Sequence, residues 1–197
     1  IEPLMEIEAG IPAREKGEIL HKILAAITRT LRSRNISLND VEEVTKAVRT
    51  GVDEVLGDKQ DDFYWQVEKN RLLGDSAEFG GLIGRWLELE KERFEKGWRW
   101  AKEEEPFSEL HFPSWSFTVR GRIDRIDWNE NTKEVYCWDY KTGGLPSLGH
   151  ICKDLLAPQL PLYLLAVRSF PEYSSVAQKG GAGFVALKSE GEATLKE

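Results

Sequence analysis

Two short stretches, GRIDRID at residues 121–127 and WDYKTG at residues 138–143, decide how this chain is interpreted. Both lie where polar and apolar residues alternate and β-branched and aromatic residues are common, which predicts strands over 117–128 and 134–140. The polar residues between them, 129–133, predict a hairpin turn. Side chains two apart on a strand share a face, so Asp139 and Lys141 are expected to point the same way.

The register of this hairpin brings two carboxylates together. If the turn is centred between Asn131 and Thr132, Asp124 lies directly opposite Asp139. Directly opposed residues have Cβ atoms roughly 4.5–5.5 Å apart, and like charges there repel each other. Two carboxylates held side by side indicate a shared proton or a bound cation. A lysine beside them favours a hydrolytic centre, in which the cation holds a substrate phosphate and Lys141 orients or helps to deprotonate a water.

The same residues also have a simpler interpretation. Asp139 and Lys141 could form an ordinary ion pair on one strand face, worth about 0–1 kcal/mol at a surface. Asp124 and Asp127 could be polar positions of an amphipathic strand. A register shifted by one residue would place Asp124 and Asp139 on opposite faces of the sheet. These residues alone leave the alternatives open.

The rest of the chain predicts an α+β domain with a mixed central sheet flanked by helices. Apolar residues at three- and four-residue steps predict a first helix, and Asn39 or Asp40 is expected to cap the second. Tryptophans at helical or helix-end positions are expected in the core or an interface: Trp65, Trp86, Trp98 and Trp100. The predicted helices cover about 13–31, 41–55, 62–73, 76–95 and 158–169, and the remaining strands cover 107–112 and 182–187.

Composition limits the class of protein. The chain has 197 residues, 41% hydrophobic and 31% charged, which excludes a disordered or collagenous chain. No apolar run approaches the ~20 residues of a membrane span, so no membrane partner is expected. The formal net charge of −7 argues against a surface that grips nucleic acid everywhere, but local basic patches could still do so.

Cysteine and methionine usage adds two expectations. Cys137 and Cys152 are too few for a disulfide framework or a four-thiolate metal site, which favours a reducing, cytoplasmic environment. The only methionine is Met5 and the chain opens at Ile1, so we expect a domain excised from a longer polypeptide.

Four motifs occur in an order that resembles a known family: RxxGxxxH at 14–21, GxxDRxD at 121–127, DYKTG at 139–143 and QxxxY at 159–163. Together they resemble the PD-(D/E)XK nuclease superfamily, in its RecB/AddB-like exonuclease branch, from about Arg14 to Leu187. The resemblance implies a restriction-endonuclease-like αβββαβ core, the order predicted above. It also implies a single nuclease domain over 1–197, with a catalytic core at about 13–35 and 103–190 and an all-helical insert at about 38–97.

The resemblance implies roles at the metal. His21, Asp124 and Asp139 would bind Mg²⁺, for which Mn²⁺ would substitute, and the backbone carbonyl of Tyr140 would be a further ligand. Lys141 would be the catalytic lysine, acting with the two aspartates. Gly17 would let the first helix approach the sheet closely near the metal. An iron–sulfur cluster, which some members of this branch bind through four cysteines, is not expected.

The resemblance also implies contacts with DNA. Gln159 and Tyr163, one helical turn apart, would line the DNA-facing side of the catalytic site. Arg122 and Arg125 are candidate phosphate contacts on the second strand, as are three arginines near the end of the first helix: Arg29, Arg32 and Arg34. Glu104 or Glu105 could be another acid of the site, but a run of three glutamates is more often solvated, so neither is included.

The function so implied is a Mg²⁺-dependent DNA nuclease that hydrolyses phosphodiester bonds. It would be an exonuclease module in helicase-linked double-strand-break repair and recombination. Its partners would be DNA ends or single strands and a helicase domain or subunit. One alternative is an inactive nuclease-like DNA-binding or scaffolding module. The presence of all four expected site residues argues against it: His21, Asp124, Asp139 and Lys141. Another is a metal-dependent hydrolase of a different phosphate, which a deep small-molecule pocket would favour.

Overall fold

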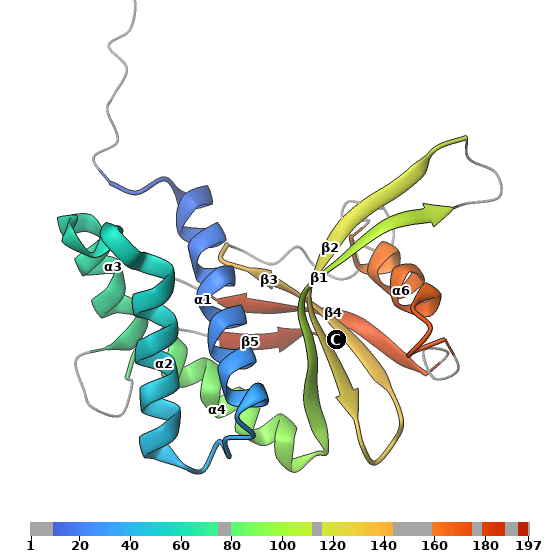
Figure 1. Ribbon diagram of the computed structural model, residues 1–197, viewed down its shortest axis with the longest axis horizontal. Helices are drawn as coiled ribbons and strands as arrows, with labels where there is room; N and C mark the ends of the chain where they lie inside the picture. The colour runs from blue at the N-terminus through green and yellow to red at the C-terminus, as the bar shows by residue number, and fades with distance from the viewer. Residues whose placement is uncertain are drawn as a thin grey trace, which may run out of the picture.

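The computed structural model describes residues 10–74, 80–111, 116–143, 159–174, 179–187 and 193–196. Its centre is a five-stranded sheet in the order β1-β2-β3-β4-β5 (Figure 1). The first three strands are antiparallel, β4 runs parallel to β3, and β5 is antiparallel to β4. This confirms the predicted mixed sheet. The strands are β1 (Trp98–His111), β2 (Thr118–Asn129), β3 (Val135–Lys141), β4 (Gly180–Leu187) and β5 (Ala193–Lys196).

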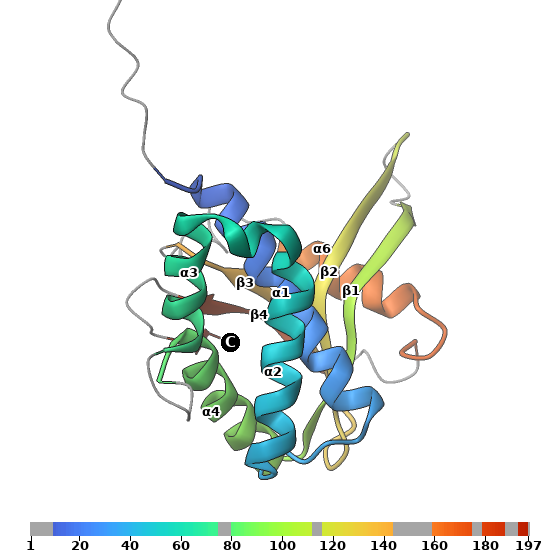
Figure 2. The ribbon, with the colours of Figure 1, turned by 60° about the vertical axis from the view of Figure 1, so that its left-hand side comes forward.

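Helices cover both faces of this sheet, as Figures 1 and 2 show. On one face, α1 packs beside α2, and their buried residues share a core with α4 and with Trp138 and Tyr140 of β3. On the other face, α6 packs Tyr163 and Ala166 against a second core that includes Cys137. The helices are α1 (Ala13–Ser33), α2 (Val41–Leu56), α3 (Phe63–Leu73), α4 (Leu82–Glu95) and α6 (Gln159–Ser169), with a short 3₁₀ helix at Gly57–Asp61.

The first two helices form for the reasons that the sequence suggests. Ile19, Ile23 and Ile27 are buried along one stripe of α1. Asp40 caps α2, because its carboxylate accepts a hydrogen bond from the backbone N–H of Glu43 at 3.1 Å. The structure thus decides between the two predicted caps in favour of Asp40.

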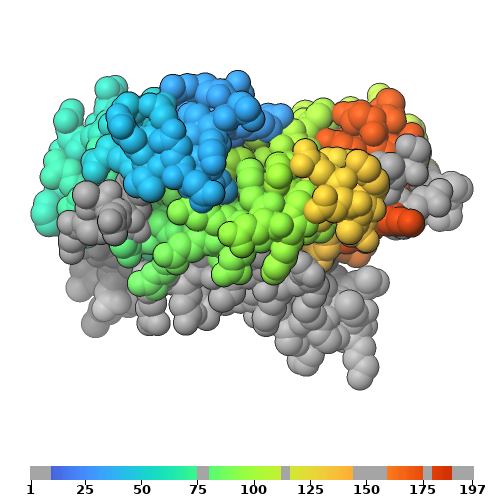
Figure 3. Space-filling model, turned by 90° about the horizontal axis from the view of Figure 1, so that it is seen from below, coloured from blue at the N-terminus to red at the C-terminus, as the bar shows by residue number. Residues whose placement is uncertain are grey.

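The β2–β3 hairpin has the predicted register. Arg125 pairs with Trp138 and Trp128 with Val135, so Asp124 and Asp139 are the next residues along the same register. Figure 3 looks onto the end of the molecule where this turn (gold) lies beside the connection from α4 to β1 (light green). There the backbone N–H of Glu130 donates to the carbonyl of Gly97 at 2.9 Å.

Two predicted boundaries are wrong, and one strand was not predicted. Strand β1 begins at Trp98 instead of near residue 107, so Trp98 and Trp100 lie on a strand and not on a helix. Its charged middle is typical of an edge strand, in which charged side chains discourage pairing with other chains. Strand β5 is absent from the prediction, and α4 begins at Leu82 instead of residue 76.

The predicted starts of the helices at residues 76 and 158 fall on residues that the structure does not describe. Residues 75–79 and Pro158 lie outside the described residues, and α6 is described from Gln159. Among the described helices, none is both long enough and apolar enough to cross a membrane.

Candidate metal and catalytic site

The candidate site lies where three neighbouring strands each contribute one carboxylate. Glu103 pairs with Arg125 and Glu105 pairs with Ile123, so Glu104 of β1 lies across from Asp124 of β2. Asp139 of β3 lies on the other side of Asp124 in the hairpin register. Three acidic side chains therefore stand in a row across the sheet.

Helix α1 adds a histidine to this row. The Nδ1 atom of His21 lies 3.4 Å from Oδ2 of Asp124. One ligand atom each from His21, Glu104 and Asp124 lies within 4.8 Å of the other two. Two carboxylates and an imidazole suit Mg²⁺ and Mn²⁺, which favour hard oxygen ligands, and Mn²⁺ also accepts imidazole nitrogen.

Helix α1 can approach because Gly17 has no side chain. A Cβ atom at Gly17 would lie 3.3 Å from Oγ1 of Thr142, just after β3. His21 stands one helical turn further along α1 and so reaches the sheet beside Asp124. The predicted close approach of helix and sheet at Gly17 is confirmed.

Asp139 and Lys141 form the second half of the site. Oδ2 of Asp139 lies 2.6 Å from Nζ of Lys141, and the hydroxyl of Tyr163 donates to Oδ1 of Asp139 at 3.2 Å. Asp139 is buried, whereas about a third of the Lys141 side chain is exposed, at 31%. The carboxylate is thus held between α6 and the lysine, and the lysine side chain remains partly exposed.

Burial and mutual repulsion shift the acid–base behaviour of the site. Burial, followed by the negative charge of Asp139, raises the pKa of Asp124 to about 7. The backbone N–H of Tyr140, which donates to Oδ2 of Asp124 at 2.9 Å, acts in the opposite direction. Burial also lowers the pKa of His21, which favours the neutral imidazole whose lone pair a metal needs.

A family model described as the PD-(D/E)XK nuclease superfamily matches residues 3–197. The chain belongs to this superfamily. Its members are metal-dependent nucleases. In this chain, a group of acidic side chains and a histidine that could hold a metal ion lies near the Asp139–Lys141 ion pair. No curated protein matches the chain.

The structure brings some of the sequence-predicted residues together at the candidate site. One contact joins His21 to Asp124, and two others join Asp139 to Lys141 and to Tyr163. Gln159 is exposed at the first described residue of α6, one turn before Tyr163.

The two arginines expected to contact DNA have opposite positions. Arg122 is exposed, and its Nη1 lies 2.9 Å from Oε2 of Glu104, at the edge of the site. Arg125 is only 1% exposed and is paired with Glu90 and Asp127. The prediction that Arg125 contacts DNA is wrong, because its guanidinium points into the core on the opposite face of β2 from Asp124.

Sequence reasoning left Glu104 out of the nuclease site. Its backbone φ of 51° is uncommon for a residue other than glycine, and such conformations cluster at active sites. The register of β1 against β2 would have revealed it, since Glu104 falls opposite Asp124. Starting the strand near residue 107 hid that signal.

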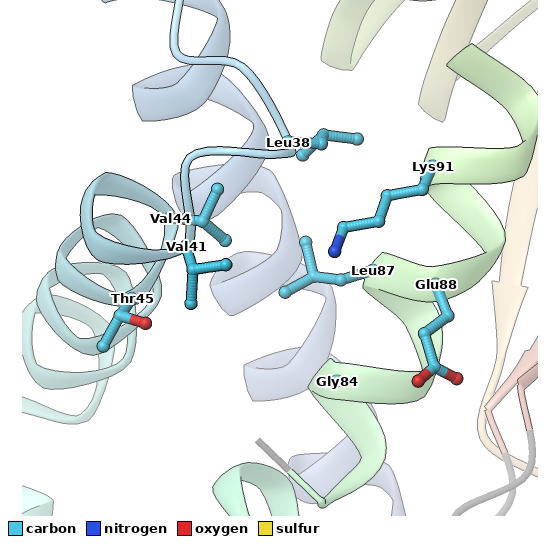
Figure 4. Close-up of a pocket in the computed structure, with 8 residues that line it drawn as sticks. All are labelled: Leu38, Val41, Val44, Thr45, Gly84, Leu87, Glu88 and Lys91. Atoms are coloured by element: carbon cyan, nitrogen blue, oxygen red, sulfur yellow. The ribbon is translucent and has the colours of Figure 1, made fainter. Parts of the chain in front are cut away.

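A separate hollow lies between α2 and α4, away from the nuclease site (Figure 4). Leu38, Val44 and Leu87 give it an apolar lining, and Glu88 and Lys91 stand at one side. None of the residues that line it belongs to the site. This hollow therefore does not supply a binding pocket for the candidate catalytic residues.

Proposed function

We propose that the chain is a Mg²⁺-dependent deoxyribonuclease of the RecB/AddB-like branch, acting as an exonuclease module in helicase-linked double-strand-break repair. The observation that carries the proposal is the convergence of His21, Glu104 and Asp124 beside the Asp139–Lys141 ion pair. This arrangement brings residues that could bind a metal ion close to the partly exposed, positively charged side chain of Lys141.

Each of these residues has a role in the proposed hydrolysis. His21, Glu104, Asp124 and Asp139 would hold the metal, with the Tyr140 carbonyl beside them. When bound there, Mg²⁺ would supply charge to stabilise the phosphate in the transition state and would lower the pKa of a bound water.

The lysine acts from the open side of the site. Lys141 positions the attacking water or offsets the negative charge of the transition state, since its side chain is partly exposed and its ammonium has no lone pair for a metal. Asp139 holds Lys141 in place, and Tyr163 fixes the orientation of Asp139 through its hydroxyl. Gln159, exposed one turn earlier on α6, would face the DNA.

Two observations weigh against the rival functions. An inactive scaffold has no need for a lysine held 2.6 Å from a buried aspartate beside three metal-ligating groups. A hydrolase of small phosphates would need a closed pocket at these residues, and the hollow between α2 and α4 shares none of them. DNA, met by Arg122 and by exposed Arg29, is the substrate that we propose.

The partners and compartment belong to the same proposal. DNA ends or single strands would be the substrate, and a helicase domain or subunit would deliver them. Cys137 is a free, buried thiol, in keeping with a reducing cytoplasm.

The test is cleavage of end-labelled single- and double-stranded DNA with Mg²⁺, with Mn²⁺ and with EDTA. Wild type should cut with either metal and not with EDTA. Lys141→Ala should retain metal and DNA yet lose at least ~100-fold in the single-turnover rate, the scale for a group that acts in the transition state. Saturating DNA keeps weak binding from passing for slow chemistry.

Lys46→Ala is the matched control. Lys46 also pairs with carboxylates, those of Glu42 and Glu43, but on the exposed side of α2. Its removal should leave cleavage unchanged. Cleavage by Lys141→Ala at the wild-type rate would refute the catalytic role, and no metal-dependent cleavage by wild type would favour the inactive module.

A further inference from the structure

We propose that Tyr140, fixed through its hydroxyl by Arg125 and Glu90, is a positioning residue that holds the metal-binding side chains in place. This inference rests on the proposed function, because it concerns the same site. It gives a role to the buried arginine and to helix α4, neither of which takes part in the proposed hydrolysis.

Tyr140 touches the site at several points. Its backbone N–H donates to Oδ2 of Asp124 at 2.9 Å. Its ring meets the His21 ring edge-on, with ring centres 5.6 Å apart. Its carbonyl is the proposed backbone ligand. A shift of this one residue would therefore disturb both Asp124 and His21.

The backbone ladder alone does not fix Tyr140 relative to β2. The described pairs between β2 and β3 end at Arg125 and Trp138, whereas pairing with β4 continues to Lys141. Beyond Trp138, a carboxylate takes the place of a strand carbonyl as the partner of the Tyr140 N–H. Side-chain contacts must then set the distance between Tyr140 and β2.

The hydroxyl of Tyr140 supplies such a contact on the α1 and α4 side of the sheet. Nη1 of Arg125 donates to it at 3.0 Å and to Oε1 of Glu90 at 2.7 Å. Nη2 of the same guanidinium donates to Oδ2 of Asp127 at 2.9 Å. Arg125 and Glu90 are each only 1% exposed. A guanidinium held by two buried carboxylates is a rigid anchor for the hydroxyl.

The guanidinium at the centre of this anchor keeps its positive charge. Burial alone would lower the pKa of Arg125, but the nearby carboxylates of Asp127 and Glu90 raise it well above its ordinary value. Trp100 donates to the second oxygen of Glu90 at 2.8 Å, which leaves that carboxylate a single orientation. Helix α4 thus fixes Arg125, Arg125 fixes Tyr140, and Tyr140 fixes the ligands, as outer partners do in metal sites.

The test is Mn²⁺ affinity measured by calorimetry on Tyr140→Phe, which removes the hydroxyl and keeps the ring and carbonyl. We expect its dissociation constant to rise roughly tenfold, the scale for losing an outer partner of a metal ligand. The Mg²⁺ concentration for half-maximal cleavage should rise similarly. A purely structural hydroxyl would move the melting temperature and neither of these quantities.

Tyr136→Phe is the matched control. Tyr136 lies four residues earlier on the same face of β3, and its hydroxyl donates to the carbonyl of Ala182 at 3.4 Å. Its removal should leave Mn²⁺ affinity unchanged. Should Tyr140→Phe fail to fold, Arg125→Lys carries the test with the same expected loss, since a lysine keeps the charge but cannot span all three partners.

The outcomes separate the inference from the function beneath it. Equal Mn²⁺ affinity in Tyr140→Phe, Tyr136→Phe and wild type overturns the positioning role alone. Absence of Mn²⁺ binding by wild type, or undiminished binding by Asp124→Asn, refutes the proposed metal site itself. Weaker binding confined to Tyr140→Phe supports the inference.

Discussion

Asp124 carries a pH dependence that can be measured without metal. Because burial and Asp139 raise its pKa to about 7, the folded protein keeps a proton that the unfolded chain releases above about pH 4. The free energy of unfolding should therefore fall as the pH rises from about 4 to about 7, and this group changes it no further above that. Above about pH 7, the folded protein is therefore destabilised by the negative charge of Asp124 beside that of Asp139.

Asp124→Asn should remove this dependence. In EDTA the variant should melt higher than wild type at about pH 8, where Asp124 is charged, and close to wild type at about pH 5. The amide oxygen can still accept from the Tyr140 N–H. Asp53→Asn, which removes an exposed aspartate paired with Lys69, serves as the control and should leave the slope unchanged. Equal slopes in Asp124→Asn and wild type would contradict a raised pKa.

At this scale, local pattern predicted the nuclease residues only in part. Asp124 and Asp139 could be placed together because a tight hairpin fixes their register within a few residues of sequence. Arg125 could not be placed, since its partner Glu90 comes from a helix 35 positions away in the chain. From the sequence alone, an arginine among other charged residues is expected at the surface. Only the fold shows that Glu90 pairs with Arg125 and allows it to be buried.

Among the elements, α2 offers a direct measurement of one sequence-level choice. Asp40 accepts from the backbone N–H of Glu43 at 3.1 Å, whereas Asn39 lies outside the cap and is exposed. Asp40→Ala should lower the free energy of unfolding by about 1 kcal/mol, the typical cost of losing an N-cap. Asn39→Ala should change it by a few tenths at most. Urea unfolding of both variants decides, and an equal loss in both would remove Asp40 as the cap.

The misplaced start of β1 has a physical cause. Strand β1 lies at the edge of the sheet, and its middle carries Lys102 and Glu103. Lys102 pairs with Glu105 of the same strand and with Glu172, and Glu103 pairs with Arg32 of α1. Such ion pairs leave no period-two apolar pattern to detect. The strands β2, β3 and β4 are more deeply covered by helices and show that pattern, which is why they were placed within a few residues.

Across the whole molecule, buried charges join the helical segment before β1 to the sheet. Arg93 and Arg125 both reach Oδ2 of Asp127, at 2.8 and 2.9 Å, and the indole of Trp138 donates to the same atom. Trp86 of α4 stacks on Trp100 of β1 with ring centres 6.0 Å apart. The segment at about 38–97, expected to be an insert, is therefore attached to the sheet by buried ion pairs, which would be broken if the segment moved away from the sheet.

This attachment predicts how the chain unfolds. Separating α4 from the sheet would break the Arg125–Glu90 and Arg93–Asp127 ion pairs, and breaking a buried ion pair costs roughly 3–5 kcal/mol. We therefore expect the helical segment and the sheet to unfold together in one transition. Far-ultraviolet circular dichroism, which follows the helices, and fluorescence of Trp86, Trp100 and Trp138 should give the same urea midpoint.

Mn²⁺ provides a second test of the same point, because none of the proposed metal ligands belongs to α4. If the chain is one cooperative unit, a Mn²⁺ concentration about 100 times its dissociation constant should raise both midpoints equally, by about 2.7 kcal/mol of stability. A helical segment that unfolds by itself would instead show a lower midpoint by circular dichroism, and Mn²⁺ would leave that midpoint where it was. Arg125→Met removes the partner that Glu90 and Asp127 share. In this variant the circular-dichroism midpoint should fall below the fluorescence midpoint and should respond less to Mn²⁺. Coincident midpoints that persist in Arg125→Met would show that apolar packing alone joins the two parts.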